Sequence, residues 1–177
     1  SVAPQFWLLG SSEQSAIYAA ELGMRYSVAH FLNPSHSHNL AQIYRDNFKA
    51  SAELAKPHVN VGVFVLCAET EEEADALALT RDVWRLGLEK GTPGPIPSVN
   101  EAYAYPFTAQ ERALIEQRRK HAICGTPAVV AEKLRVLATK HQADELVIIS
   151  NCYDFEVRKK SYKLLAKEFA LQAAVQA

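Results

Sequence analysis

The stretch of sequence that decides the fold runs from Phe6 to Phe31 and reads FWLLGSSEQSAIYAAELGMRYSVAHF. A short apolar run ends at Gly10, and a helical pattern begins after two serines. A second apolar run, Tyr26–Phe31, follows the helical pattern. Strand, turn, helix and strand in this order predict one βαβ unit.

The turn between the first strand and the helix contains Ser11 and Ser12. Backbone N–H groups and hydroxyls at the positive end of a helix suit an anion, most often a phosphate. The alternative is a structural role, in which Ser11 and Gln14 form a capping box. Glu13 weighs against an anion, because a carboxylate in the first turn competes with it unless the side chain points outward.

Length and composition are those of a globular protein. The chain has 177 residues, of which 49% are hydrophobic and 22% charged, and its net charge is −1. We therefore expect a single domain over residues 1–177. No basic stripe predicts nucleic-acid binding, since Arg118, Arg119 and Lys120 fit the cationic end of a helix. No apolar run of roughly 18 residues predicts a membrane span, and without a signal-peptide pattern we expect a cytoplasmic protein.

The three cysteines, Cys67, Cys124 and Cys152, are expected to be structural thiols. They are widely spaced, and no CxxC motif predicts a zinc cluster or a redox pair. The loop that contains His36 and His38 has a spacing that can bind metal, but no acidic or thiol ligand lies near it in sequence. We therefore expect no metal site.

Strand-like apolar runs alternate with helical patterns along the chain. The predicted strands are Phe6–Leu9, Tyr26–Phe31, Val59–Cys67 and Leu146–Ser150. Alternation of this kind predicts an α/β fold with a parallel sheet and helical crossovers. The runs are almost continuously apolar, as in strands that are buried on both faces.

Helix-start signals place the helices between and after these strands. The predicted helices are Ser11–Leu22, Asn39–Leu54, one that begins at Thr70 and is ended by Gly91, one that begins at Thr108, one that begins at Thr126-Pro127, and Glu156–Phe169. Residues 91–107 are rich in Pro and Gly and predict neither a helix nor a central strand. This segment, which contains Tyr103 and Tyr105, is either a lid over a hydrophobic substrate or a mobile insertion.

The segment WLLGSSEQSAIYAAELGMRYSVAHFL resembles the central part of the bacterial luciferase-like, flavin-dependent monooxygenases. Further resemblances follow in the family's order: IYRDNFKASAELAKPHVNVGVFVLCAET, CGTPAVVAEKLRVLATKHQADELVI and RKKSYKLLAKEF. Members of this family are (β/α)8 barrels of roughly twice this length. The resemblance therefore implies half of a (β/α)8 TIM-type barrel, with four parallel strands and helical crossovers. These correspond to strands five to eight, and the N-terminal half is absent from this chain.

The resemblance also implies an activity. In this family, reduced FMN and O2 oxygenate an aldehyde or another small organic substrate, while the protein positions the cofactor and excludes water. The implied partners are the substrate, molecular oxygen and a separate flavin reductase.

Two alternatives remain beside this activity. The chain could be a non-catalytic fragment, or a half-barrel that associates with itself through two exposed strand edges, so we expect that it is not a monomer. A Rossmann-type nucleotide site is less favoured, because the turn reads Gly-Ser-Ser and no acidic residue ends the second strand.

By resemblance, the turn that holds the FMN phosphate consists of Gly10, Ser11, Ser12 and Ser15. In physical terms, two groups of donors could hold a dianion at the helix N-terminus. They are the hydroxyls of Ser12 and Ser15 and the N–H groups of Ser11 and Ser12.

Ala29, His30 and Phe31 end the second strand and, by resemblance, lie near the flavin. His30 is the candidate for a catalytic proton donor or acceptor, and the alternative is a packing or hydrogen-bonding role.

Polar residues also follow the last predicted strand, namely Ser150, Asn151, Cys152 and Asp154. A barrel places pocket-lining residues there, but Asp154 could equally begin a helix. Cys152 is not expected to act as a nucleophile, because no histidine is arranged to activate it.

Overall fold

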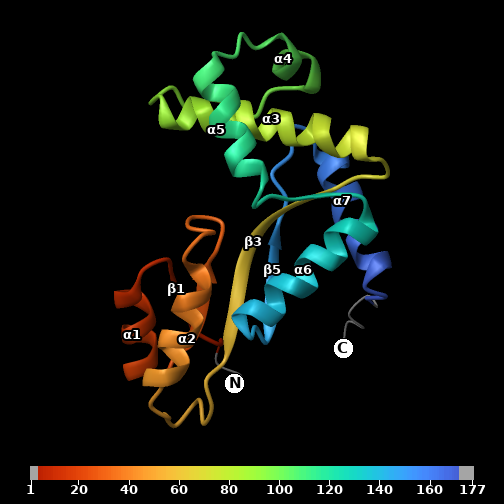
Figure 1. The fold of residues 1–177 in the computed structure, drawn as a ribbon. Helices are drawn as coiled ribbons and strands as arrows, with labels where there is room; N and C mark the ends of the chain where they lie inside the picture. The colour runs from red at the N-terminus through yellow and green to blue at the C-terminus, as the bar shows by residue number, and fades with distance from the viewer. Residues whose placement is uncertain (1–3, 172–177) are drawn as a thin grey trace. The chain divides into compact units, whose positions relative to one another are not determined.

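The computed structural model describes residues 4–171, which contain five strands and seven helices (Figure 1). The strands are β1 (Trp7–Gly10), β2 (Arg25–Ala29), β3 (Val59–Cys67), β4 (Ile123–Gly125) and β5 (Glu145–Ile149). The helices are α1 (Glu13–Glu21), α2 (Ser37–Asn47), α3 (Glu71–Glu89), α4 (Val99–Ala104), α5 (Ala109–Arg119), α6 (Pro127–His141) and α7 (Phe155–Glu168). β1–β2, β2–β3 and β3–β4 pair in parallel, and β5 pairs with β3. The predicted α/β fold with a parallel sheet and helical crossovers is confirmed.

The chain divides into two compact units. The first is Ser1–Val63 with Arg135–Ile149, and the second is Phe64–Leu134 with Ser150–Ala177. β3 and α6 contribute residues to both. The single domain over residues 1–177 stays a prediction.

The core of the first unit lies between one face of its strands and helices α1 and α2. Its buried residues are Tyr26, Val28, Val59 and Val61 from the strands and Ala16, Ala19, Ala20, Leu40, Ala41 and Tyr44 from the helices. The alanines of α1 allow its backbone to approach the strands closely, because they carry no bulky side chain. α1 and α2 lie side by side in this unit (Figure 1).

The other face of these strands is less covered. Leu8 and Leu146 pack on the core, so their neighbours Leu9 and Val147 point to the opposite face, where they are 58% and 42% exposed. Asn60 points to this face as well, and its Oδ1 atom is buried without a hydrogen-bond partner among the described residues. Within residues 4–171, β1 pairs only with β2, and β5 only with β3. Both outer strands therefore keep one free edge in this part of the chain.

A side-chain cluster fixes the start of β3. Asp144 Oδ2 accepts hydrogen bonds from the Val59 N–H group at 2.7 Å and from Arg45 Nη2 at 2.9 Å. The same Arg45 nitrogen donates to the Gln142 carbonyl oxygen at 2.6 Å. This charge-assisted network ties the turn before β5 to the first residue of β3.

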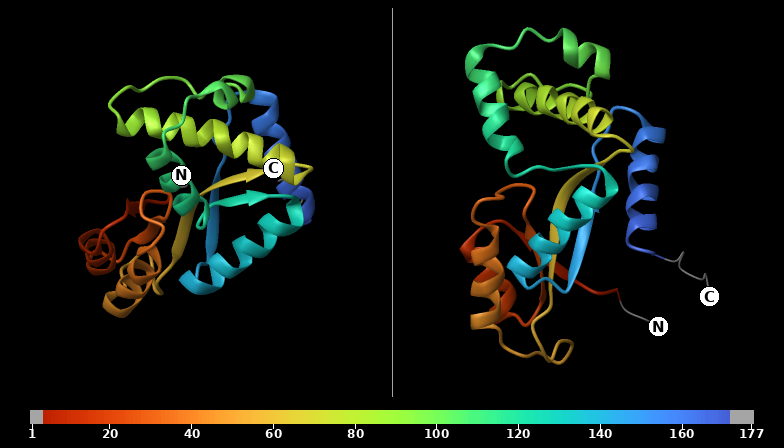
Figure 2. Two further views of the ribbon diagram at one scale, coloured as in Figure 1. Left: turned by 45° about the horizontal axis from the view of Figure 1, so that its top comes forward. Right: turned by 45° about the vertical axis from the view of Figure 1, so that its right-hand side comes forward.

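The second unit is built around the carboxyl end of β3. β4 pairs with Val65–Cys67 in parallel, as the arrows in Figure 2 show, and α3 packs against β4. Ser161 Oγ accepts a hydrogen bond from the Cys67 N–H group at 2.9 Å, and Ser150 Oγ donates to the Val65 carbonyl oxygen at 2.9 Å. Helix α7 thus satisfies a backbone group at the end of the strand.

Three expectations from the sequence need correction. There are five strands instead of four, because β4 is three residues long and too short to show a periodic pattern. Residues 91–107 contain helix α4, which begins with a capping box between Ser98 and Glu101. That Ser-x-x-Glu spacing is a helix-start signal, but the surrounding prolines and glycines obscured it. Helix α2 also ends at Asn47, before the predicted end at Leu54.

A polar cluster attaches α4 and α5 to the end of α3. Glu111 is buried and forms an ion pair with Lys90, and Tyr105 Oη donates to Glu111 Oε1 at 3.1 Å. The hydrogen bond from Lys90, together with the N–H group of Thr108, lowers the pKa of Glu111 to about 2. Glu111 therefore stays ionised across the physiological range.

Within residues 4–171, none of the helices combines the length and the apolar composition that crossing a lipid bilayer requires.

A buried histidine joins α6 to α2 in the first unit. His141 Nδ1 lies 2.9 Å from the Leu137 carbonyl oxygen, so this nitrogen carries the proton. His141 Nε2 lies 2.8 Å from Ser37 Oγ and accepts its hydrogen bond. Burial lowers the pKa of His141 below its ordinary value of 6.5, and the positive charge of nearby His38 and Lys140 acts in the same direction. The ring is therefore held neutral.

We predict that acidification weakens the fold through His141. The unfolded chain binds this proton at about pH 6.5, whereas the folded chain binds it only at lower pH. The free energy of unfolding should therefore fall as the pH drops below 6.5. It should stop falling once the pH is below the pKa that His141 has in the folded chain. Thermal unfolding of His141→Gln over this pH range should show a weaker dependence than the wild type. The exposed His121→Gln is the control, and an equal pH dependence of wild type and His141→Gln would contradict the prediction.

Candidate functional site

The turn between β1 and α1 is closed by a pair of serines. Ser12 is the N-cap residue in an extended conformation, and its Oγ accepts a hydrogen bond from the Ser15 N–H group at 3.3 Å. Ser15 Oγ accepts in return from the Ser12 N–H group at 3.3 Å. The predicted capping box between Ser11 and Gln14 is therefore wrong by one residue at each position. A serine at the third helical position takes the part that glutamate or glutamine usually plays.

Tyr26 of the neighbouring strand β2 forms hydrogen bonds with this turn. Its Oη atom lies 3.0 Å from Ser15 Oγ and donates to the Gly10 carbonyl oxygen at 3.3 Å. Ser15 Oγ also donates to the Ser12 carbonyl oxygen at 2.6 Å. Tyr26 is fully buried, and burial raises its pKa above 10.0, so the phenol stays neutral. Sequence reasoning missed this role, because Tyr26 reads as an ordinary apolar strand residue.

The turn leaves a limited set of donors for a ligand. The Ser12 N–H group donates to Ser15 Oγ at 3.3 Å, and its part in binding a phosphate stays a prediction. In the described part of the chain, the N–H groups of Glu13 and Gln14 have no hydrogen-bond acceptor. They lie in the first turn of α1, where the helix dipole favours an anion. The exposed Ser12 and the half-buried Ser11 lie beside them.

Gly10 is required for the approach of Ser15 to the strand. A Cβ atom on Gly10 would lie 2.1 Å from Ser15 Oγ and 2.3 Å from Ser15 Cβ. Any other residue would push Ser15 away from Tyr26 and open the reciprocal cap.

The residues at the end of β2 are packed tightly. Ala29 is 1% exposed and pairs with Gly62 of β3. His30 is 7% exposed, and its ring packs edge-on against His141 at 5.7 Å between centroids. Phe31 lies over Gly62, where a Cβ atom would come within 3.0 Å of the ring. The structure thus gives His30 a packing role, and its approach to a flavin stays a prediction.

The predicted pocket residues after β5 have structural partners in the second unit. Ser150 is buried, and its N–H group donates a hydrogen bond to Tyr162 Oη at 3.0 Å. Asp154 is the N-cap of α7, and its side chain accepts from the Val157 N–H group at 2.9 Å. Burial raises the pKa of Cys152 to about 11, which disfavours a thiolate nucleophile.

The other two cysteines resemble Cys152. Burial raises the pKa of Cys67 to about 11 and also raises that of Cys124. These shifts support the structural role expected for all three thiols.

Tyr103, Tyr105 and His38, which the sequence also singled out, lie in different surroundings. Tyr103 is 65% exposed, whereas Tyr105 is bonded to Lys90 and Glu111, so a lid made by both tyrosines is not seen. His38 packs against His141. Within residues 4–171, no cluster of three or more His, Cys, Asp or Glu side chains could hold a metal ion.

Comparison with known proteins places this geometry in a family. A family model described as luciferase-like monooxygenase matches residues 1–142. The uncharacterized protein YceB of Bacillus subtilis (strain 168) is 41% identical over 167 residues, which cover 94% of this chain and 50% of YceB. The crystal structure of apo-MsnO8 is 29% identical with a TM-score of 0.83, over 97% of this chain and 52% of that chain.

A more distant structure has the same fold and contains a flavin. It is the oxygenating constituent of 3,6-diketocamphane monooxygenase from the CAM plasmid of Pseudomonas putida, in complex with FMN. Its TM-score is 0.60 at 19% identity, over 94% of this chain and 48% of that chain. The chain therefore spans about half the length of the relatives that it matches. The predicted fold, half of a luciferase-like barrel, is confirmed apart from the number of strands.

We predict that Gly10→Ala destabilises the protein through the serine turn. The added Cβ atom displaces Ser15, so the reciprocal cap is lost and the free energy of unfolding falls by about 1–2 kcal/mol. Chemical denaturation measures this difference. Gly94→Ala is the matched control, since a Cβ atom there meets nothing within 4 Å. Equal stability of the two variants would contradict the prediction.

Proposed function

The chain belongs to the luciferase-like monooxygenase family, and from this premise we propose that the whole protein is an FMN-dependent monooxygenase. Reduced FMN and O2 would oxygenate an aldehyde or another small organic substrate, and the flavin would supply the oxygen chemistry. This chain would contribute the C-terminal half of the barrel and the site for the FMN phosphate.

The observation that carries the proposal is the serine turn after β1. Two first-turn N–H groups, of Glu13 and Gln14, remain for an outside acceptor in the described part of the chain, and the hydroxyl of Ser12 is exposed beside them. These donors and the helix dipole fit a phosphate. The turn also follows a barrel strand, and the ligands of this architecture bind at the carboxyl ends of the strands. The FMN complex of the related fold adds a cofactor with a phosphate of this kind.

The uncovered face of the first unit supports a missing half of the barrel. Leu9 and Val147 are exposed on it, and the buried Asn60 Oδ1 atom lacks a partner among the described residues. Four further strands would pair with the free edges of β1 and β5, cover the apolar side chains and offer donors to Asn60. They would also add the rest of the flavin and substrate pocket.

The same face favours a second candidate, a half-barrel without turnover that associates with itself. A second copy could cover the apolar face and the strand edges, but it would not supply the other half of the pocket. A separate flavin reductase and a cytoplasmic location stay predictions.

We predict that the serine turn retains FMN. The chain is mixed with FMN and gel-filtered, and the flavin absorbance is read per mole of protein. In the double variant Ser12→Ala, Ser15→Ala, the cap opens and a hydroxyl donor is lost, so the affinity for FMN should fall at least about tenfold. Ser98→Ala, which removes the cap of α4 in the second unit, should retain FMN like the wild type.

Equal retention by the double variant and the wild type would place the phosphate elsewhere. No retention by the wild type would mean that this half alone does not form the flavin site.

We also predict that this chain is not a monomer in solution. Its two free strand edges and exposed apolar side chains favour association. Light scattering coupled to gel filtration should give a dimer or a larger species. A compact monomer with the mass of one 19.6 kDa chain would contradict this prediction.

A further inference from the structure

The open face of the first unit is the side of its strands that faces away from α1 and α2. Val28 of β2 and Val59 and Val61 of β3 belong to the core that these helices cover. Successive side chains of a strand point to opposite faces, so Ser27 and Asn60 project from the open face. These two residues are Cα partners in the parallel ladder. The open face therefore carries two polar side chains next to each other.

The side-chain amide of Asn60 lacks a hydrogen bond that its burial requires. Asn60 is 6% exposed, and its Oδ1 atom is buried without a partner among residues 4–171. Buried polar atoms in native proteins almost always have a hydrogen-bond partner, so this oxygen marks a place where a donor is missing. The donor must come from the side of the open face, because helices α1 and α2 cover the other side of the strands.

Apolar side chains flank the two polar residues. Leu9 of β1 is the Cα partner of Ser27 and is 58% exposed. Val147 belongs to β5, which pairs with β3, and it is 42% exposed on the same face. A polar pair between exposed apolar side chains is typical of a surface that another layer of protein covers.

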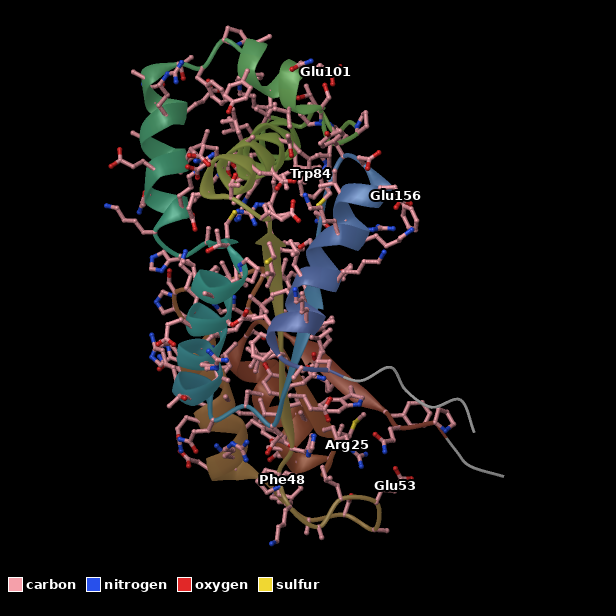
Figure 3. All side chains as sticks on the ribbon, turned by 90° about the vertical axis from the view of Figure 1, so that its right-hand side faces the viewer. Arg25, Phe48, Glu53, Trp84, Glu101 and Glu156 are labelled. Atoms are coloured by element: carbon pink, nitrogen blue, oxygen red, sulfur yellow. The ribbon has the colours of Figure 1, made fainter. Side chains whose placement is uncertain are left out.

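A second row of side chains lies on the same face, two residues earlier in each strand. Trp7 packs edge-on against His58 at 5.4 Å between ring centroids, and His58 Nε2 lies 2.9 Å from Glu145 Oε1. Arg25, labelled in Figure 3, belongs to this row because it is the Cα partner of Trp7. An aromatic and ionic row thus runs beside the row that contains Asn60, and this pattern restricts the registers in which a covering layer can dock.

We propose that the open face binds the half of the barrel that this chain lacks, and that Asn60 accepts a hydrogen bond from a polar side chain of that half. This inference rests on the proposed function, in which the chain is the C-terminal half of a barrel. The chain covers only 50% of YceB, so this relative has about as much chain again to supply the covering layer.

Each part of the open face has a role in this contact. The free edges of β1 and β5 would pair with the outer strands of the other half. Leu9 and Val147 would pack against apolar side chains of that half. The amide of Asn60 would turn its oxygen toward a hydroxyl, amide or ammonium donor.

The test measures capture of this chain by the half of YceB that the chain does not match. That half carries an affinity tag and is coexpressed with the wild type or a variant, without added flavin. The wild type should be captured in an equimolar amount. Asn60→Leu removes the hydrogen bond and leaves the donor of the other half unpaired, so capture should fall at least about tenfold. Leu9→Lys places a charge in an apolar contact and should have the same effect.

Thermal unfolding of the chain without the other half separates binding from folding. Asn60→Leu removes a buried polar atom that has no partner in the described part of the chain. This variant should therefore unfold at the same temperature as the wild type or at a higher one. A purely structural role of Asn60 would instead lower both the unfolding midpoint and the capture.

Two further variants control for the changes in side chain. Val136 is also 58% exposed but lies on helix α6, so Val136→Lys should be captured like the wild type. Asn39 is an exposed asparagine of α2, so Asn39→Leu should be captured like the wild type as well.

The proposal is overturned if the wild type is not captured, or if Asn60→Leu is captured as well as the wild type. A wild-type dimer that Leu9→Lys dissociates, without capture by the half of YceB, would show that a second copy covers the face instead.

FMN retention measured on the same proteins separates this proposal from the flavin site. The double variant Ser12→Ala, Ser15→Ala should be captured like the wild type, because the contact does not involve FMN. Capture without FMN retention would contradict only the proposed flavin site, and FMN retention without capture would contradict only the proposed contact.

Discussion

The hydrogen bonds of β3 are the constraint on which the remaining structure depends. β2 pairs with its first four residues, β4 with its last three, and β5 also pairs with it. Side chains from distant parts of the sequence satisfy both ends of the strand. Asp144 accepts from the first N–H group, at Val59, and Ser161 accepts from the last, at Cys67. The polar backbone groups of a strand that is buried along almost its whole length need hydrogen-bond partners, and these two contacts satisfy the N–H groups at its two ends.

The sequence predicts the elements that have a strong period or an unambiguous signal. Val59–Cys67 is an apolar run of nine residues interrupted only by Asn60, and its predicted bounds agree with those of β3. Thr108 is the N-cap of α5, as predicted, and Asp154, for which a pocket role and a helix start were both open, is the N-cap of α7. β4 could not be predicted in this way, since three residues define no period and their strand conformation depends on pairing with β3.

The position of the candidate site could be predicted from the sequence, but its hydrogen-bond arrangement could not. Gly10 and the serines marked the turn, but three serines within five residues offered more than one capping register. The register is set by Tyr26, which contacts Ser15 from the neighbouring strand and cannot be identified from the local sequence.

The caps of the helices differ in net charge. α4 and α5 begin with boxes in which Glu101 and Glu111 reach back to the cap residue, so each of these helix starts carries its own carboxylate. The equivalent position of α1 is Ser15, and its cap is made by two neutral hydroxyls. The hydrogen bonds have the same pattern in all three helices, but the cap of α1 itself carries no charge, and the carboxylate of its first turn is that of the exposed Glu13. A glutamate in place of Ser15 would add a second carboxylate to this first turn, so the identity of one capping residue changes the charge that an anion would meet at the start of α1.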